Sequence, residues 1–285
     1  MSQKPYLDVN KIQQQFPDID QLELFDFGGQ KIIYKGMHQT HGIIMLKFFR
    51  TNEDDPRIAR EISIAQTLIH DNLPKLYQAG SIQFDSSESK VVYLLEEYIE
   101  GETLRAYMKK SPISMQVCKS FLDVMLSILQ ILKEHNLVHR DLKPENIIVK
   151  NGNFFILDFG IARELSSDSI TNTSSPMGPH TLGYAPWEQI SNEKDIITEK
   201  TDLFSMAVIC QEMLTGEHPF IVEPNSSIDL MDQTRNLKIK PLGLSTPINN
   251  ILENFLHSLM SKLPSSRPTL EQTIEWFNEF KEQMK

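Results

Sequence analysis

The most informative stretch of this chain is His139-Arg140-Asp141-Leu142-Lys143-Pro144-Glu145-Asn146. Residues 141 to 146 combine a carboxylate, an ammonium group and a carboxamide beside a proline that restricts the backbone. A carboxylate can accept a hydroxyl proton, a cation can neutralise a phosphate, and a carboxamide can bind a metal ion. This combination suits phosphoryl transfer. The alternative interpretation is that the stretch is only a surface turn of mixed charge.

The overall composition is ordinary for a globular protein. The chain has 285 residues, of which 40% are hydrophobic and 23% are charged, enough for one two-lobed domain or two small domains. A formal net charge of −10 argues against a nucleic-acid partner and favours basic peptides as substrates. Cys118 and Cys210 stand far apart in apolar helical patterns, which predicts two buried free thiols.

No targeting segment is expected at the start of this sequence. The first residues, MSQKPYLD, lack the apolar core of a signal peptide. No uncharged run reaches the length of a membrane span. We therefore expect a cytoplasmic protein that has no membrane span.

Three further motifs follow the opening stretch in a fixed order. Asp158-Phe159-Gly160 comes after the apolar run 154–157, residues 181–188 read TLGYAPWE, and residues 266–269 read SRPT. Together with HRDLKPEN, these resemble the catalytic loop, DFG, GTxGYxAPE and SxRPT segments of eukaryotic-type protein kinases. Trp187 stands where the third motif has proline. The resemblance covers nearly the whole chain, from about residue 24 to about residue 280.

The resemblance implies an α+β fold of the bilobal protein-kinase type, with a small β-rich N-lobe and a larger α-helical C-lobe. The expected boundaries are residues 1–23 for an N-terminal extension, 24–100 for the N-lobe up to the hinge, and 101–285 for the C-lobe. Residues 7–16 favour a short helix before Pro17. This helix either packs on the back of the small lobe or is a regulatory segment.

Local patterns predict individual elements of the C-lobe. In residues 115–135 the apolar residues recur at helical spacing, which predicts a core helix. The apolar face consists of Phe121, Met125, Ile128 and Leu132. The run Asn151-Gly152-Asn153 between two short apolar segments predicts a tight turn. Thr269 and Gln272 are spaced as a capping box at the start of the last helix.

The resemblance implies that residues around 26–33 cover the phosphates of ATP. Kinases use the pattern GxGxxGxV here, and with Ile33 as the valine, Gly28 is the middle glycine. The first and third glycines are replaced, but Gly28 and Gly29 still allow close backbone approach. Lys31, in place of the third glycine, offers an ammonium group to the nucleotide.

Lys47 ends the apolar run 44–47, at the place of the kinase VAIK strand. Apolar residues then recur at helical spacing at Ile58, Ile62, Ala65 and Ile69. Glu61 lies beside this stripe, where a buried carboxylate is costly without a cation. The resemblance implies that Lys47 binds the α- and β-phosphates and is held by Glu61.

The run 91–95 is rich in β-formers and leads into a hinge-like segment. The resemblance implies that backbone groups of Glu97 and Ile99 bind adenine and that Glu102 reaches the ribose. Glu96 falls at the gatekeeper position, which is usually apolar in kinases. Either Glu96 lines the back of the pocket near Lys47, or the register of the strand slips by one residue. In the first case its carboxylate competes with Glu61 for Lys47.

The resemblance also assigns roles in phosphoryl transfer. Asp141 orients the substrate hydroxyl and accepts its proton, while Lys143 neutralises charge on the moving phosphoryl group. Asn146 and Asp158 are expected to bind Mg²⁺.

The segment between Gly160 and Gly183 is rich in hydroxyl groups and resembles an activation loop. Arg140 and Arg163 are cations that can bind a phosphate placed in it. The expected phosphorylation sites are Thr171, Thr173, Ser174 and Ser175, whereas Thr181 is expected to bond the catalytic groups. Thr181 and Lys143 also mark serine/threonine rather than tyrosine kinases.

A further set of residues is expected to hold the C-lobe in its working conformation. Asp202 would order the backbone of the catalytic loop, and Arg267 would pair with Glu188. The full set of expected structural residues is His139, Arg140, Glu188, Asp202 and Arg267.

The sequence therefore predicts an ATP- and Mg²⁺-dependent serine/threonine protein kinase that acts on protein substrates and phosphorylates itself. One alternative is a pseudokinase, a scaffold without catalysis, because the glycine loop is degenerate and Glu96 is unusual. A second is a small-molecule phosphotransferase of related fold, although such enzymes lack the TxGYxxxE and SxRPT elements.

Overall fold

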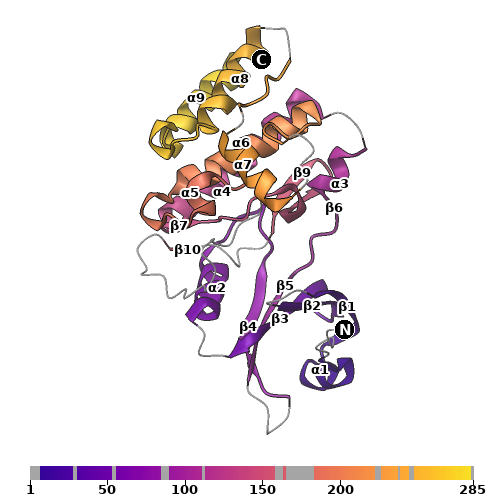
Figure 1. The fold of residues 1–285 in the computed structure, drawn as a ribbon. Helices are drawn as coiled ribbons and strands as arrows, with labels where there is room; N and C mark the ends of the chain where they lie inside the picture. Colours follow the sequence, from indigo (N-terminus) through magenta and orange to yellow (C-terminus); the bar gives the residue numbers. More distant parts are fainter. Residues whose placement is uncertain are drawn as a thin grey trace. The chain divides into compact units, whose positions relative to one another are not determined.

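The structure is a computed structural model. It describes residues 7–27, 31–52, 56–84, 90–110, 113–157, 163–164, 183–221, 226–236, 238–243 and 247–283. The chain divides into two compact units, Met1–Glu100 and Gly101–Lys285. Strands dominate the first unit and helices the second (Figure 1). The predicted α+β class, with a β-rich N-terminal part and a helical C-terminal part, is confirmed.

The N-terminal unit is built on an antiparallel sheet whose five strands lie in the order β1-β2-β3-β5-β4. The strands are β1 (Ile19–Phe27), β2 (Lys31–His38), β3 (Gly42–Asn52), β4 (Leu76–Ile82) and β5 (Val91–Glu97). Strand β1 therefore begins before residue 24, within the segment that the sequence suggested as an extension.

The two faces of this sheet are covered by different helices. Because side chains alternate along a strand, Leu46 and Phe48 of β3 point to the face opposite to that of Lys47 and Phe49. Helix α1 (Val9–Gln15) covers the first face, that of Leu46 and Phe48. The core cluster between this helix and the sheet contains Ile12, Phe16, Ile19, Ile32, Tyr34, Ile44, Leu46, Phe48, Tyr93 and Leu95. The helix expected at residues 7–16 is therefore present and packs on the sheet.

Helix α2 (Pro56–Thr67) lies on the second face, where Ile62 packs against Phe49, Val92 and Leu94. The expectation that Ile69 belongs to the apolar stripe of this helix is wrong. The helix ends before Ile69, which is exposed, and Leu68 is buried instead. The second face thus carries Lys47, α2 and a small apolar cluster.

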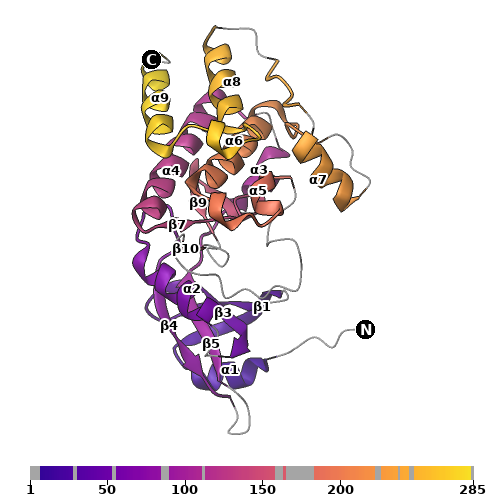
Figure 2. The same cartoon turned by 60° about the vertical axis from the view of Figure 1, so that its left-hand side comes forward.

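The core of the C-terminal unit is formed by two long helices, α4 (Met115–Glu134) and α6 (Glu199–Thr215), which pack against each other (Figure 2). The predicted apolar face of α4 is confirmed, because Phe121, Met125, Ile128 and Leu132 are all buried. By length and composition α4 is able to cross a membrane, but its buried face and its packing on α6 and α9 are those of a core helix. Cys118 and Cys210, on these two helices, are buried free thiols, as predicted.

Shorter elements complete this unit. They are β6 (Glu102–Thr103), α3 (Leu104–Met108), β7 (Leu137–Val138), η1 (Pro144–Asn146), β8 (Ile147–Lys150), β9 (Asn153–Ile156), β10 (Arg163–Glu164), α5 (Trp187–Ile190), η2 (Lys194–Ile196), α7 (Ser227–Asn236), α8 (Pro247–Leu259), η3 (Pro264–Ser266) and α9 (Leu270–Gln283).

Two local predictions in this unit are confirmed. Strands β8 and β9 pair through a tight turn at Asn151 and Gly152, whose φ angles of 52° and 80° lie in the left-handed region. At the start of α9, the Thr269 N–H donates to Gln272 Oε1 (2.9 Å), and the Gln272 N–H donates to Thr269 Oγ1 (3.3 Å). This is the capping box that the spacing indicated.

Candidate active site

In the N-terminal unit, the register of the sheet brings Lys47 and Glu96 together. Lys47 of β3 lies opposite Leu94 of β5, and Glu96 is two residues further along the same strand. Such diagonal neighbours on one face are within reach of long side chains. Lys47 Nζ lies 2.5 Å from Glu96 Oε2, and the side chains are only 13% and 12% exposed. The carboxylate of Glu96 therefore lies beside Lys47, as the first alternative for this residue expected.

The same face of the sheet carries other residues expected to bind a nucleotide. Ile33 lies opposite Lys47, and Lys31 precedes it by two residues on the same strand. At the end of β5 the Glu97 N–H donates to the Lys75 carbonyl (2.8 Å). The backbone N–H of Glu97 is therefore already paired within the N-terminal unit.

In the C-terminal unit, a buried aspartate fixes the backbone of the loop that carries Asp141. The carboxylate of Asp202 on α6 accepts hydrogen bonds from the N–H groups of His139 (2.7 Å) and Arg140 (2.9 Å). Arg140 has a φ of 67°, in the left-handed region that residues with a side chain rarely adopt. Burial raises the pKa of Asp202, and the two N–H donors and the charge of Arg140 oppose that rise. The expected role of Asp202 is thereby confirmed.

Two of the expected catalytic side chains, Asp141 and Lys143, meet the expected metal ligand Asn146 within this loop. Asn146 Nδ2 donates to the Asp141 carbonyl (2.9 Å) and to Asp141 Oδ2 (2.8 Å). Lys143 Nζ lies 3.1 Å from the same Oδ2. Asn146 uses its amide nitrogen on Asp141, and Oδ1 is the atom of this side chain that has the chemistry of a ligand for a hard cation. Among the described residues, no group of three or more His, Cys, Asp and Glu side chains is able to hold a metal ion.

A buried ion pair fixes the segment that follows residue 183. Arg267 Nη1 and Nη2 contact Glu188 Oε1 (2.5 Å) and Oε2 (3.1 Å), a bidentate geometry. The guanidinium also donates to the carbonyls of Ser261 (2.8 Å) and Lys200 (3.2 Å). Next to Glu188, Gln189 Nε2 donates to the Arg140 carbonyl (2.5 Å), which ties α5 to the catalytic loop. The predicted pairing of Arg267 with Glu188 is confirmed.

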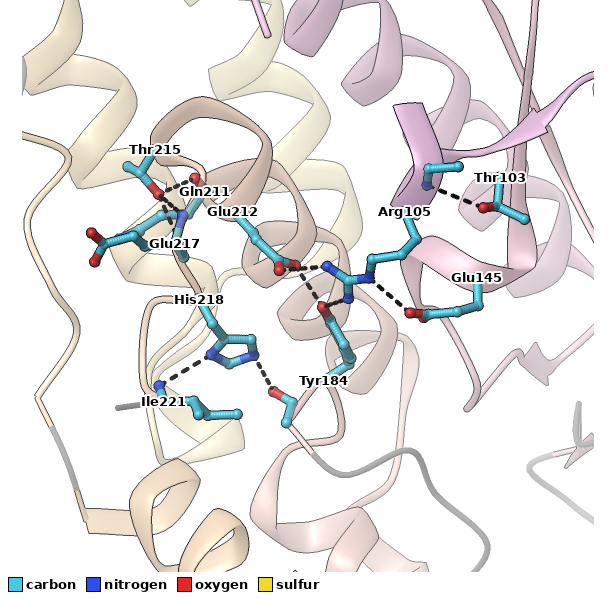
Figure 3. Close-up of polar contacts among 12 residues, drawn as sticks. Thr103, Arg105, Glu145, Tyr184, Gln211, Glu212, Thr215, Glu217, His218 and Ile221 are labelled. Carbon is cyan, nitrogen blue, oxygen red and sulfur yellow. Dashed lines mark hydrogen bonds and ion pairs between the residues drawn. The ribbon is translucent and has the colours of Figure 1, made fainter. Parts of the chain in front are cut away.

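Arg105 of α3 and three residues from other parts of the chain form a cluster that the sequence did not predict (Figure 3). Its guanidinium donates to Glu145 Oε1 (2.8 Å), to Glu212 Oε1 (2.6 Å) and to the Tyr184 hydroxyl. That hydroxyl donates to Glu212 Oε2 (2.5 Å). Burial alone would lower the pKa of Arg105, but the two carboxylates raise it above the ordinary value. The cluster thus joins α3, η1, α6 and the segment after residue 182.

His218 lies near this cluster and holds Gly183 (Figure 3). Its Nδ1 accepts from the N–H groups of Phe220 and Ile221 (both 3.2 Å), so its proton is on Nε2, which donates to the Gly183 carbonyl (3.0 Å). Burial lowers the pKa of His218 to about 4. Gly183 has a φ of 94°, and a Cβ there would lie 2.9 Å from Ile221 Cδ1, so only glycine fits.

In a comparison with known protein families, residues 23–277 match the protein kinase domain. The chain belongs to the protein kinase domain family. The serine/threonine-protein kinase PrkC of Bacillus subtilis is 33% identical over 190 residues, which are 66% of this chain and 28% of that protein. The serine/threonine-protein kinase PknB of Mycolicibacterium smegmatis is 30% identical over 209 residues, 70% of this chain and 32% of that protein. The kinase chain spans about a third of the length of these relatives.

Several predicted residues of this kinase domain lie outside the described residues. They are Gly28, Gly29, Asp158, Thr171, Thr173, Ser174, Ser175 and Thr181, and the side chain of Glu61. Glu102 is described, and its carboxylate pairs with Lys110 Nζ (2.7 Å). These assignments therefore remain predictions.

Sequence reasoning missed Arg105 and His218 in this kinase domain. Arg105 stands in no motif, and its partners lie 40, 79 and 107 residues away in the sequence. His218 lies inside the TGxxPF-like run 215–220. The one available signal for His218 was its place between Gly216, which ends α6, and Pro219.

Proposed function

We propose that this protein kinase domain transfers the γ-phosphoryl group of ATP to serine or threonine hydroxyls of protein substrates. The observation that carries this proposal is the arrangement of Asp141, Lys143 and Asn146 on a loop fixed by Asp202. The names of the relatives PrkC and PknB support the choice of serine and threonine.

The geometry gives each of these side chains a task. Asp141 presents a carboxylate that is oriented by the amide of Asn146, as needed to align a hydroxyl nucleophile and accept its proton. Lys143, on the same oxygen, supplies a positive charge for the transferring phosphoryl group. Most of the rate enhancement then comes from positioning and electrostatic stabilisation.

The described residues fit a nucleotide bound with Mg²⁺. Lys47 places an ammonium group on the second face of the sheet, the face that carries α2, and this charge is suited to the α- and β-phosphates. Asn146 Oδ1 is the oxygen that would bind Mg²⁺, together with the Asp158 carboxylate expected from the sequence. Such an ion would supply charge neutralisation of the phosphates.

The test is phosphate transfer from γ-labelled ATP to a basic protein substrate, with the purified chain and Mg²⁺. Asp141→Asn is expected to lower the rate by roughly 10²-fold or more, because the proton acceptor is lost. Lys47→Met is expected to abolish transfer while circular dichroism shows a folded chain. Asp195→Asn, at an exposed position of η2, is the matched control and should keep wild-type activity.

Two outcomes of this experiment would contradict the proposal. Equal labelling by wild type and Asp141→Asn would show that the loop does not carry the reaction. No labelling by wild type, with nucleotide still bound, would favour the pseudokinase alternative.

A further inference from the structure

The ion pair of Lys47 and Glu96 is built into the sheet. Both residues lie on neighbouring strands whose register is set by backbone hydrogen bonds, and their charged atoms are 2.5 Å apart. Their side chains are 13% and 12% exposed, so solvent screens the pair less than it would a surface pair. Because both residues lie on strands of one sheet, the contact forms without any contribution from helix α2.

We propose that Glu96 is an affinity-determining residue that restrains Lys47 and weakens the binding of nucleotide phosphates. The inference rests on the proposed function, in which Lys47 binds the α- and β-phosphates. In the nucleotide-free protein the ammonium charge of Lys47 is already neutralised by a carboxylate. A phosphate chain that approaches Lys47 therefore meets a pair with no net charge.

Two effects act in the same direction. The carboxylate of Glu96 repels the phosphates, since like charges several ångströms apart in a protein interact unfavourably. In addition, a poorly solvated ammonium group gains more from an anionic ligand when less negative charge already surrounds it. Removal of the Glu96 charge thus makes phosphate binding more favourable on both counts.

The test compares the dissociation constants of adenosine, ADP and ATP, measured by calorimetry on the full chain. Glu96→Gln keeps the size of the side chain and removes its charge. ADP and ATP are expected to bind it about fivefold or more tightly than they bind wild type, by the interaction of one charge across several ångströms. Adenosine, which has no phosphate, should bind both proteins equally. Glu23→Gln removes a charge at an exposed position of β1 and should behave as wild type.

A second comparison uses the wild-type protein and an apolar variant. If Glu96 neutralises Lys47, the phosphates add little affinity in the wild-type protein, and ADP binds within a few-fold of adenosine. Glu96→Met, apolar and of similar length, should reproduce the gain seen with Glu96→Gln.

The outcomes separate this inference from the proposed function. Weaker or unchanged ADP and ATP binding by Glu96→Gln would overturn the inference and, if weaker, would make Glu96 a positioning residue for Lys47. Tight ADP binding by wild type, with adenosine far weaker, would also overturn it. Failure of wild type and Glu23→Gln to bind any of the three ligands would count against the proposed function as well.

Discussion

At Arg140 the backbone adopts a left-handed conformation that costs about 1–2 kcal/mol for a residue with a side chain. Two hydrogen bonds to the buried carboxylate of Asp202 offset this cost, because bonds to a charged group contribute about 1.5–3 kcal/mol each. The strained residue directly precedes Asp141, whose N–H donates to His139 Nδ1 (3.2 Å). A single aspartate on α6 thus determines the direction in which the catalytic carboxylate leaves the loop.

His218 should make the stability of the C-terminal unit depend on pH. Its pKa is about 4 in the folded protein because of burial, and it returns to about 6.5 on unfolding. Between these values the unfolded chain binds more protons, so acid favours unfolding. Stability that is fully present above pH ~6.5 is lost as the pH falls to ~4, by up to about 3 kcal/mol.

The measurement is the free energy of unfolding between pH 7 and pH 4 for wild type and His218→Gln. The variant, neutral throughout, should lose less stability over this range. His135→Gln, at an exposed position at the end of α4, is the control and should follow wild type. Parallel curves for wild type and His218→Gln would contradict the buried, neutral state of His218.

Among the elements, α1 shows how a segment outside the recognised motifs can belong to the core. Phe16, the residue that follows this helix, meets Tyr93 edge to face at 4.8 Å between ring centroids and Phe48 at 6.1 Å. The Tyr34 hydroxyl donates to the Leu7 carbonyl (2.8 Å), which fixes the chain before the helix. The segment therefore acts as a structural cover for the face of the sheet opposite Lys47.

Phe16→Ala is expected to destabilise the N-terminal unit by about 3 kcal/mol, because it removes a buried aromatic ring and leaves a cavity. Chemical denaturation followed by circular dichroism, with amide exchange in β3 and β5, measures this loss. Gln14→Ala, at an exposed position of α1, should change stability by less than about 0.5 kcal/mol. A cost for Phe16→Ala as small as that of the control would show that α1 does not pack on the sheet.

Elements with a strong local signal were predictable from the sequence. The apolar face of α4, the Asn151–Gly152 turn and the capping box of Thr269 and Gln272 depend on residues close together in the chain. Ile69 was misplaced because periodicity continues beyond the point where the helix ends, and burial falls on Leu68. A repeating pattern indicates a helix, but it does not specify the last residue.

At the scale of the whole molecule, the proposed phosphoryl transfer assigns tasks to residues of both units, Lys47 in the first and Asp141 in the second. The roles of single residues were predictable where a motif carries them, as for Asp202 and Arg267. The contact of Lys47 with Glu96 was left open, because it depends on which residue of β5 lies opposite Lys47. Strand register is a property of the folded sheet and is not evident from spacing along the chain.

A whole-molecule prediction is that the chain phosphorylates itself between residues 166 and 181. This window lies outside the described residues, and the prediction rests on its many hydroxyl groups. We expect phosphate at one or more of Thr171, Thr173, Ser174 and Ser175, and little at Thr181, whose hydroxyl is expected to bond Asp141 and Lys143. Phosphates there would be bound by arginine side chains, which would order the loop.

Mass spectrometry of the protein after incubation with Mg-ATP measures this modification, beside Asp141→Asn treated in the same way. The active protein should carry phosphate in this window, and the variant should not. Modification of both proteins to the same extent, or of neither, would refute the prediction.

The cluster around Arg105 also has a consequence for how this sequence can change over evolutionary time. Arg105, Glu145, Tyr184 and Glu212 share one set of hydrogen bonds, and Glu212 is only 10% exposed. A substitution of Arg105 alone would leave a poorly solvated carboxylate without its cation, which typically costs a protein several kcal/mol. Arg105 and Glu212 are therefore expected to be replaced together in related sequences, although the two positions lie 107 residues apart along the chain.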